Sequence, residues 1–167
     1  MSGWYLFSVW LHILAATVWI GSMIFLGVAV VPLLRRPEFA SVRTALLYRL
    51  GLRFRWIGWA VLLLLVGTGI VNIGYRGYGW DDLWSGALWQ GPWGRTLAWK
   101  LVLVLLVMGI SAVHDFYLGP RTMQLLERGA ASAERLRRTA SYLGRLMTLL
   151  SLVILALAVL LVRGGGR

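Results

Sequence analysis

The sequence contains no cysteine, which excludes disulfides, thiol redox chemistry and thiolate metal sites. Acidic residues are also few: six Asp and Glu stand against 17 Lys and Arg, so the formal net charge is +11. The chain has only two histidines, His12 and His114, and a single lysine, Lys100. Chemistry that needs an imidazole or a lysine amine must therefore use one of these three side chains.

Hydrophobic residues, by contrast, make up 59% of the chain, and its mean hydropathy of +0.75 is far above that of a soluble domain. A helix needs about 20 apolar residues to cross a hydrocarbon core of about 30 Å, and lipid forces each span to satisfy its own backbone hydrogen bonds. We therefore predict an all-α membrane protein. It is expected to be an antiparallel bundle of four transmembrane helices, forming one domain over residues 1–167, with helices at about 3–34, 54–75, 95–118 and 140–163.

Arginine is concentrated in two of the predicted connections. Residues 35–55 and residues 121–145 carry six arginines each, whereas the connection between the second and third helices carries only Arg76 and Arg95. The positive-inside rule places the arginine-rich connections in the cytoplasm and both termini outside, in a multi-pass membrane protein. Both rich connections are expected to contain short amphipathic segments that lead into the next helix. Their charge suits anionic lipid headgroups and does not call for nucleic acid.

The connection at residues 75–94 is rich in glycine and carries four tryptophans. Tryptophan prefers the level of the lipid headgroups, so this segment is expected to form an interfacial belt with a short helix capped by Asp81 or Asp82. A lid over a site in the outer half of the membrane is the alternative.

Ionisable groups inside a bilayer are costly and are usually functional. With a rise of 1.5 Å per residue and antiparallel neighbours, His12, Lys100 and Asn72 are expected at one depth, below Arg76 and Arg95. His114 is expected roughly 20 Å deeper, too far to share one metal ion with His12. The outer cluster is therefore the first candidate site.

Small residues near Trp19 on the first helix, and Gly67 and Gly69 on the second, allow a close approach. They fit either a slot for a flat, porphyrin-sized ligand or ordinary close packing of helices. At the cytoplasmic end, His114 and Asp115 lie among arginines. They can serve either as a metal ligand with anchors for an anion, or as an ion-pair network between helices.

Several short motifs, taken together, resemble the copper-resistance protein D family. They are Leu11-His12-Ile13, Trp19-Ile20-Gly21, Arg53-Phe54-Arg55, Thr68-Gly69, Gly94-Arg95, Lys100-Leu101-Val102-Leu103 and Leu118-Gly119-Pro120-Arg121. More distantly, the chain looks like the HemJ-type membrane protoporphyrinogen oxidases. The first resemblance implies a copper transport component of the inner membrane. The second implies a b-haem oxidase of a porphyrinogen, with His12 and Lys100 as the essential pair, although Ala98 stands where that pattern has a histidine.

Copper(I) favours soft ligands, and the chain offers only methionines, of which Met23, Met108 and Met147 can converge in the inner half. Haem needs one or two imidazoles, a slot and basic groups for its propionates. Our leading hypothesis is therefore a b-type haem protein with a redox role toward a quinone or porphyrin substrate. Copper transport, and a non-catalytic assembly subunit, are the alternatives, and the sequence leaves a homo-oligomer open.

Within the haem hypothesis each candidate residue has an expected role. His12 is the metal ligand, and His114 is a second candidate ligand. Lys100 is a sixth ligand or a catalytic partner of the substrate. The remaining expected cofactor contacts come from Trp19, Asn72, Arg76 and Arg95.

Overall fold

The computed structural model describes residues 2–127 and 132–164. Within these residues the helical elements are, in chain order, α1 (Gly3–Phe25), η1 (Leu26–Val30), α2 (Val31–Leu34), η2 (Pro37–Phe39), α3 (Arg43–Gly74), α4 (Trp80–Ser85), η3 (Ala87–Trp89), α5 (Gly91–Ala112), η4 (Val113–Leu118), α6 (Gly119–Glu127) and α7 (Ser132–Val162). Several of them join end to end into longer helices. In the described part of the chain, four such helices are long and apolar enough to cross a membrane: Gly3–Leu34, Arg43–Gly74, Gly91–Leu125 and Ser132–Val162.

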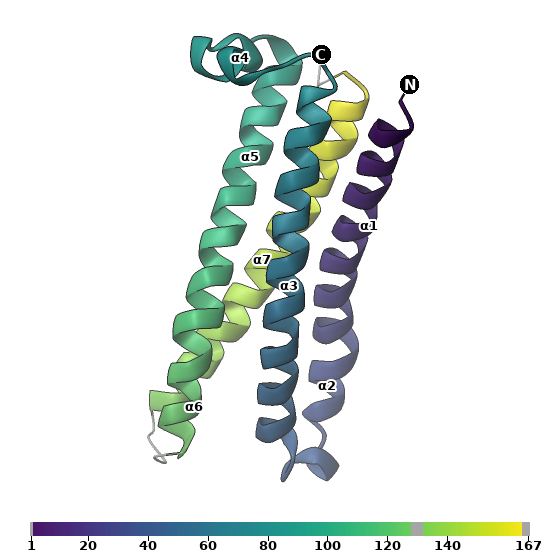
Figure 1. Cartoon of the computed structure of the whole chain (residues 1–167). Coiled ribbons are helices and arrows are strands. Elements are labelled where there is room, and N and C mark those ends of the chain that lie inside the picture. Colours follow the sequence, from purple (N-terminus) through teal and green to yellow (C-terminus); the bar gives the residue numbers. More distant parts are fainter. Residues whose placement is uncertain (1, 128–131, 165–167) are drawn as a thin grey trace.

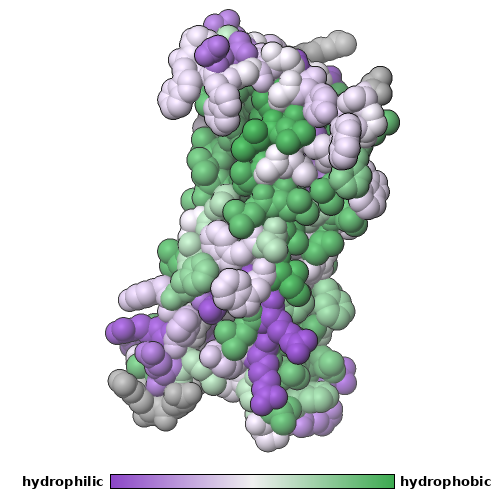
Figure 2. Space-filling view, in the orientation of Figure 1, coloured by the Kyte–Doolittle hydropathy of each residue, from purple (hydrophilic) through white to green (hydrophobic). Residues whose placement is uncertain are grey.

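This arrangement confirms the predicted all-α membrane bundle. In Figure 1 the long helices alternate in direction, and the start of α1 and the end of α7 lie at the same end of the bundle as α4. Figure 2 shows a broad hydrophobic band around the middle of the visible face, with hydrophilic residues gathered toward its two ends. Whether the α4 end faces the outside stays a prediction.

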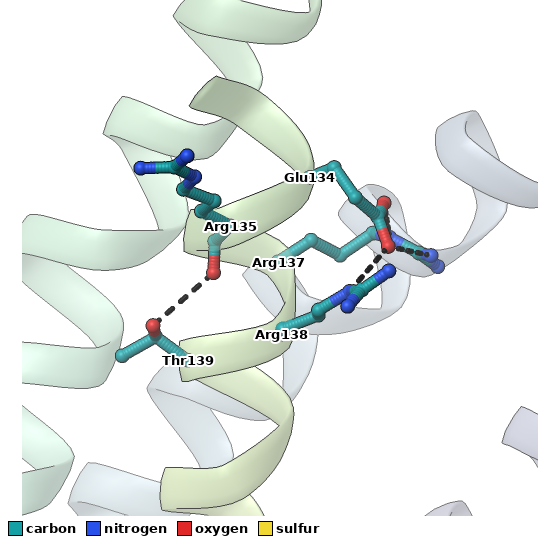
Figure 3. Close-up of polar contacts among 5 residues, drawn as sticks. All are labelled: Glu134, Arg135, Arg137, Arg138 and Thr139. Carbon is teal, nitrogen blue, oxygen red and sulfur yellow. Dashed lines mark hydrogen bonds and ion pairs between the residues drawn. The ribbon is translucent and has the colours of Figure 1, made fainter. Parts of the chain in front are cut away.

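The second and fourth helices begin earlier than the expected starts near residues 54 and 140. Their amphipathic lead-in segments continue the same helices without a break, so α3 starts at Arg43 and α7 at Ser132. Figure 3 shows the first turns of α7, where Glu134 accepts hydrogen bonds from Arg137 Nε at 2.8 Å and Arg138 Nε at 3.1 Å. These exposed pairs add little stability, but a carboxylate in the first turn suits the helix dipole.

The long helices associate unevenly. α1 packs mainly along α3 and α5 along α7, and α7 also contacts α1. The contact between α1 and α7 includes a hydrogen bond from Trp19 Nε1 to Ser151 Oγ at 3.0 Å. Gly58 makes room for the same indole, because a Cβ at that position would lie 3.1 Å from the Trp19 ring. The Trp19 side chain thus contacts both α3 and α7.

Two π-helical segments, η1 and η4, were not predicted from the sequence. Each lies just before a proline, Pro32 after η1 and Pro120 after η4. Proline lacks a backbone N–H and its ring displaces the carbonyl four residues earlier. A wider π turn re-satisfies the freed backbone groups inside a membrane helix. Such turns are frequent at functional sites, and η4 carries His114 and Asp115.

The connection between α3 and α5 forms a cap on one end of the bundle. The predicted short helix is α4, and the backbone N–H of Gly79 donates to Asp82 Oδ2 at 2.7 Å. The cap packs on the helices through a cluster of buried leucines, Leu88, Leu97 and Leu161. Gly94 is required for this fit, because a Cβ there would lie 2.5 Å from the carbonyl oxygen of Leu88.

Candidate functional site

His12 is held against α3 through one of its two ring nitrogens. Its Nδ1 lies 2.7 Å from Thr68 Oγ1, and the Thr68 hydroxyl donates its only proton to the carbonyl of Leu64, also at 2.7 Å. While the Thr68 hydroxyl donates to this carbonyl, it accepts from the imidazole, and a neutral ring then carries its proton on Nδ1. Because Nδ1 contacts Thr68, Nε2 is the nitrogen through which a ligand would bind, as in metal sites where a second residue fixes the histidine tautomer.

Residues of α3 next to Thr68 also pack against the His12 ring. A Cβ at Gly69 would lie 3.6 Å from His12 Cε1, so the imidazole rests close to the α3 backbone. One turn outward, Ser8 Oγ donates to Asn72 Oδ1 at 2.9 Å. Asn72 thus bonds to Ser8, one helical turn from the level at which Thr68 contacts His12. Of the two glycines named on this helix from the sequence, Gly69 thus lies close to a neighbouring side chain, whereas a Cβ at Gly67 would meet nothing within 4 Å.

Lys100 approaches His12 from α5. It is half-buried, and it lies close enough for its charge to act on the imidazole. That the two side chains lie at equal depth stays a prediction. A positive charge in this position raises the free energy of a bare cation at His12 and lowers that of an anionic group. The catalytic and ligand roles of the pair remain predictions.

The other predicted cofactor contacts have partners of their own. Trp19 bonds to Ser151, about 10 Å deeper than His12 by its place along α1. The Arg76 guanidinium lies 5.0 Å from the centre of the Trp93 ring, and that ring stacks on Tyr78 with centroids 5.3 Å apart. Arg95 is exposed. Arg76 therefore makes a cation–π contact in the cap, above the level of His12.

The half of the bundle far from α4 contains a second polar cluster, centred on Asp115. His114 Nδ1 lies 2.9 Å from Asp115 Oδ1, and Trp59 Nε1 donates to Asp115 Oδ2 at 3.2 Å. The carboxylate fixes the His114 tautomer in the same way that Thr68 fixes that of His12. Arg55 stacks over the Phe116 ring at 5.4 Å. Trp59 and Phe116 were missed by sequence reasoning, although Trp59 follows Arg55 by one helical turn.

A further buried contact lies between α5 and α7, where Ser111 Oγ donates to Met147 Sδ at 3.2 Å. Ser111 was also missed as a candidate, while Met147 was expected in the inner half. Among the described residues, no group of three or more His, Asp or Glu side chains is placed to hold a metal ion. A metal site in this part of the chain must therefore use fewer donors, or include sulfur.

Comparison with known proteins places these residues in a family context. The family model described as copper resistance protein D matches residues 48–161. An uncharacterized protein of Aquifex aeolicus (strain VF5) is 31% identical over 150 residues, which cover 89% of each chain. No solved structure matches the chain. The family match includes Thr68, Lys100, His114 and Met147, and it begins after His12.

Proposed function

Because the chain belongs to the copper resistance protein D family, we propose that it carries copper ions through its membrane and that His12 is the outer ligand. The observation that carries the proposal is the hydrogen bond from His12 Nδ1 to Thr68, which leaves Nε2 free in the outer half of the bundle. Imidazole is a suitable ligand for copper, and an ionisable side chain within a membrane helix marks ion pathways.

Lys100 makes this outer site a weak one. Two unit positive charges in the same part of a protein repel by an amount on the order of 2 kcal/mol at an effective dielectric constant of about 20. A copper ion at His12 is therefore held for a short time and released. That property suits transport, because an ion must bind well enough to enter a pathway and weakly enough to leave it.

Uptake by proteoliposomes tests the proposal. We expect wild-type protein to transport copper and His12→Gln to lose most of that activity, because the amide cannot replace the imidazole lone pair. Ile13→Ala is the matched control, since Ile13 is an exposed neighbour on the same helix. It should transport copper like the wild type. Equal uptake by the His12 variant, or no uptake above empty vesicles by the wild type, would refute the proposal.

Binding of b-type haem, with a redox role toward a quinone or porphyrin, is the second candidate. One observation favours it: the charge of Lys100 acts on His12, and an ammonium in that position attracts an anionic group such as a haem propionate. An open, mostly apolar groove of about 320 Å³ also lies beside Thr68, between α1 and α3.

An absorption spectrum decides between the candidates. The haem hypothesis predicts a Soret band in detergent-solubilised protein, which His12→Ala abolishes or shifts. Protein that stays colourless after reconstitution with haemin would end that hypothesis and would leave the copper proposal unaffected.

A further inference from the structure

The Ser111 hydroxyl donates to a sulfur atom, the thioether of Met147. Several helical hydroxyls in this chain donate to the carbonyl four residues earlier, as Thr17, Ser22, Thr96, Thr122 and Thr148 do, while Ser8 donates to the Asn72 amide oxygen. Ser111 is only 2% exposed and donates to the thioether of Met147 instead. A thioether is a weak acceptor, so this contact does more to orient the sulfur than to satisfy the hydroxyl. The sulfur keeps a second lone pair.

His114 lies one helical turn beyond Ser111. The π-helical segment η4, which carries His114, packs against α7, which carries Met147. Asp115 contacts His114 through Nδ1, so a metal ion would bind to the other ring nitrogen, Nε2. An imidazole and a thioether, each contacted by a neighbouring side chain, therefore lie on two elements that pack against each other.

The local charge also favours a cation here. Asp115 is the only acidic residue between positions 83 and 126, and its carboxylate contacts His114 directly. Arg55, stacked on Phe116, offsets part of that charge. The outer site has an ammonium, Lys100, and no carboxylate close to it in the sequence. Asp115 thus gives His114 a negatively charged neighbour in direct contact.

We propose that His114 Nε2 and Met147 Sδ form an inner copper(I) site, with Ser111 and Asp115 as positioning residues. The inference rests on the proposed copper function and names the second binding station of the same pathway. Soft thioether sulfur together with imidazole selects copper(I). Zinc and other borderline ions need more nitrogen or oxygen donors than this pair provides.

X-ray absorption on the purified full-length protein loaded with copper(I) tests the site. We expect a copper–sulfur scattering shell in the wild type, which Met147→Leu removes. Competition with a chromophoric copper(I) chelator should show at least a tenfold weaker affinity for Met147→Leu and for His114→Gln. Exchange of Met for Leu keeps the core volume, so the fold should survive. Met123→Leu, on α6, is the matched control and should keep both properties.

The outcomes separate this inference from the proposed function. A wild type without the sulfur shell, or a Met147→Leu variant that retains it, overturns the inner site. Vesicle uptake that depends on His12 would then leave copper transport intact. A sulfur shell lost in Met123→Leu instead would assign the copper to another methionine and overturn the inference as well. Normal copper(I) affinity in His114→Gln would remove the imidazole from the site.

Discussion

The hydrogen bond between His12 and Thr68 can be tested on its own, without any assumption about the ligand. Thr68→Val keeps the volume and branching of a side chain that is 7% exposed, and it deletes the hydroxyl that accepts from Nδ1. Hydrogen bonds between membrane helices contribute about 0.6 kcal/mol on average, up to about 1.7. Because this bond is short and buried against Gly69, we expect a loss near the upper end, about 1–1.5 kcal/mol.

Two measurements check this prediction. Reversible unfolding in mild detergent gives the change in free energy. Nitrogen NMR of histidine-labelled protein reports which ring nitrogen carries the proton, and the share of the Nδ1–H form of His12 should fall in Thr68→Val. His114 is an internal reference, because its Nδ1 partner is Asp115. Thr68→Ser keeps the hydroxyl and should preserve the tautomer. An unchanged tautomer and stability in Thr68→Val would refute the assignment of a free Nε2.

Three further predictions concern the cap, the charge at the outer site and the orientation of the chain. Gly94→Ala should destabilise the protein by roughly 1–3 kcal/mol in thermal unfolding, because the new methyl meets backbone atoms at 2.5 Å, whereas Gly67→Ala, with open space around it, should change stability by less than about 1 kcal/mol. Lys100→Met should tighten copper binding that depends on His12 by roughly 30-fold in chelator competition, since about 2 kcal/mol of repulsion is removed, and an unchanged affinity would contradict the electrostatic argument. Because the chain lacks native cysteine, Ser2→Cys should react with a membrane-impermeant maleimide in intact cells and Glu38→Cys only after permeabilisation; the reverse pattern would invert the predicted orientation.

The architecture was predictable because hydropathy and length decide it. A span of the membrane requires a long apolar helix, and the described chain has four of them. The π turns were not predicted, although Pro32 and Pro120 were visible in the sequence. A proline indicates that the backbone hydrogen bonding must change locally. Whether the helix then kinks, ends or widens depends on its packing against neighbouring helices.

The candidate site was predictable in depth and less so in its lateral contacts. Helix rise is constant, so residue number gives the level of His12 and Lys100 along the bundle. The partner of each side chain depends on how the helices are rotated about their axes. Thr68 therefore holds His12 where Asn72 was the expected neighbour, and Ser111 holds Met147 through a contact that no spacing rule indicates. Sequence reasoning favoured haem, whereas the family match favours copper.

Charge is distributed unevenly along the interior of the bundle, and this bears on the direction of transport. Lys100 lies near the end that carries α4, and Asp115 lies in η4, toward the arginine-rich end. A copper ion that moves from His12 to His114 leaves the ammonium of Lys100 and approaches the carboxylate of Asp115, whose attraction Arg55 partly offsets. With the arginine-rich connections in the cytoplasm, that direction is inward, and a negative-inside membrane potential adds about 2.3 kcal/mol per charge for every 100 mV. Reversed labelling of Ser2→Cys and Glu38→Cys would make the same movement outward, so orientation decides the direction of the proposed copper transport.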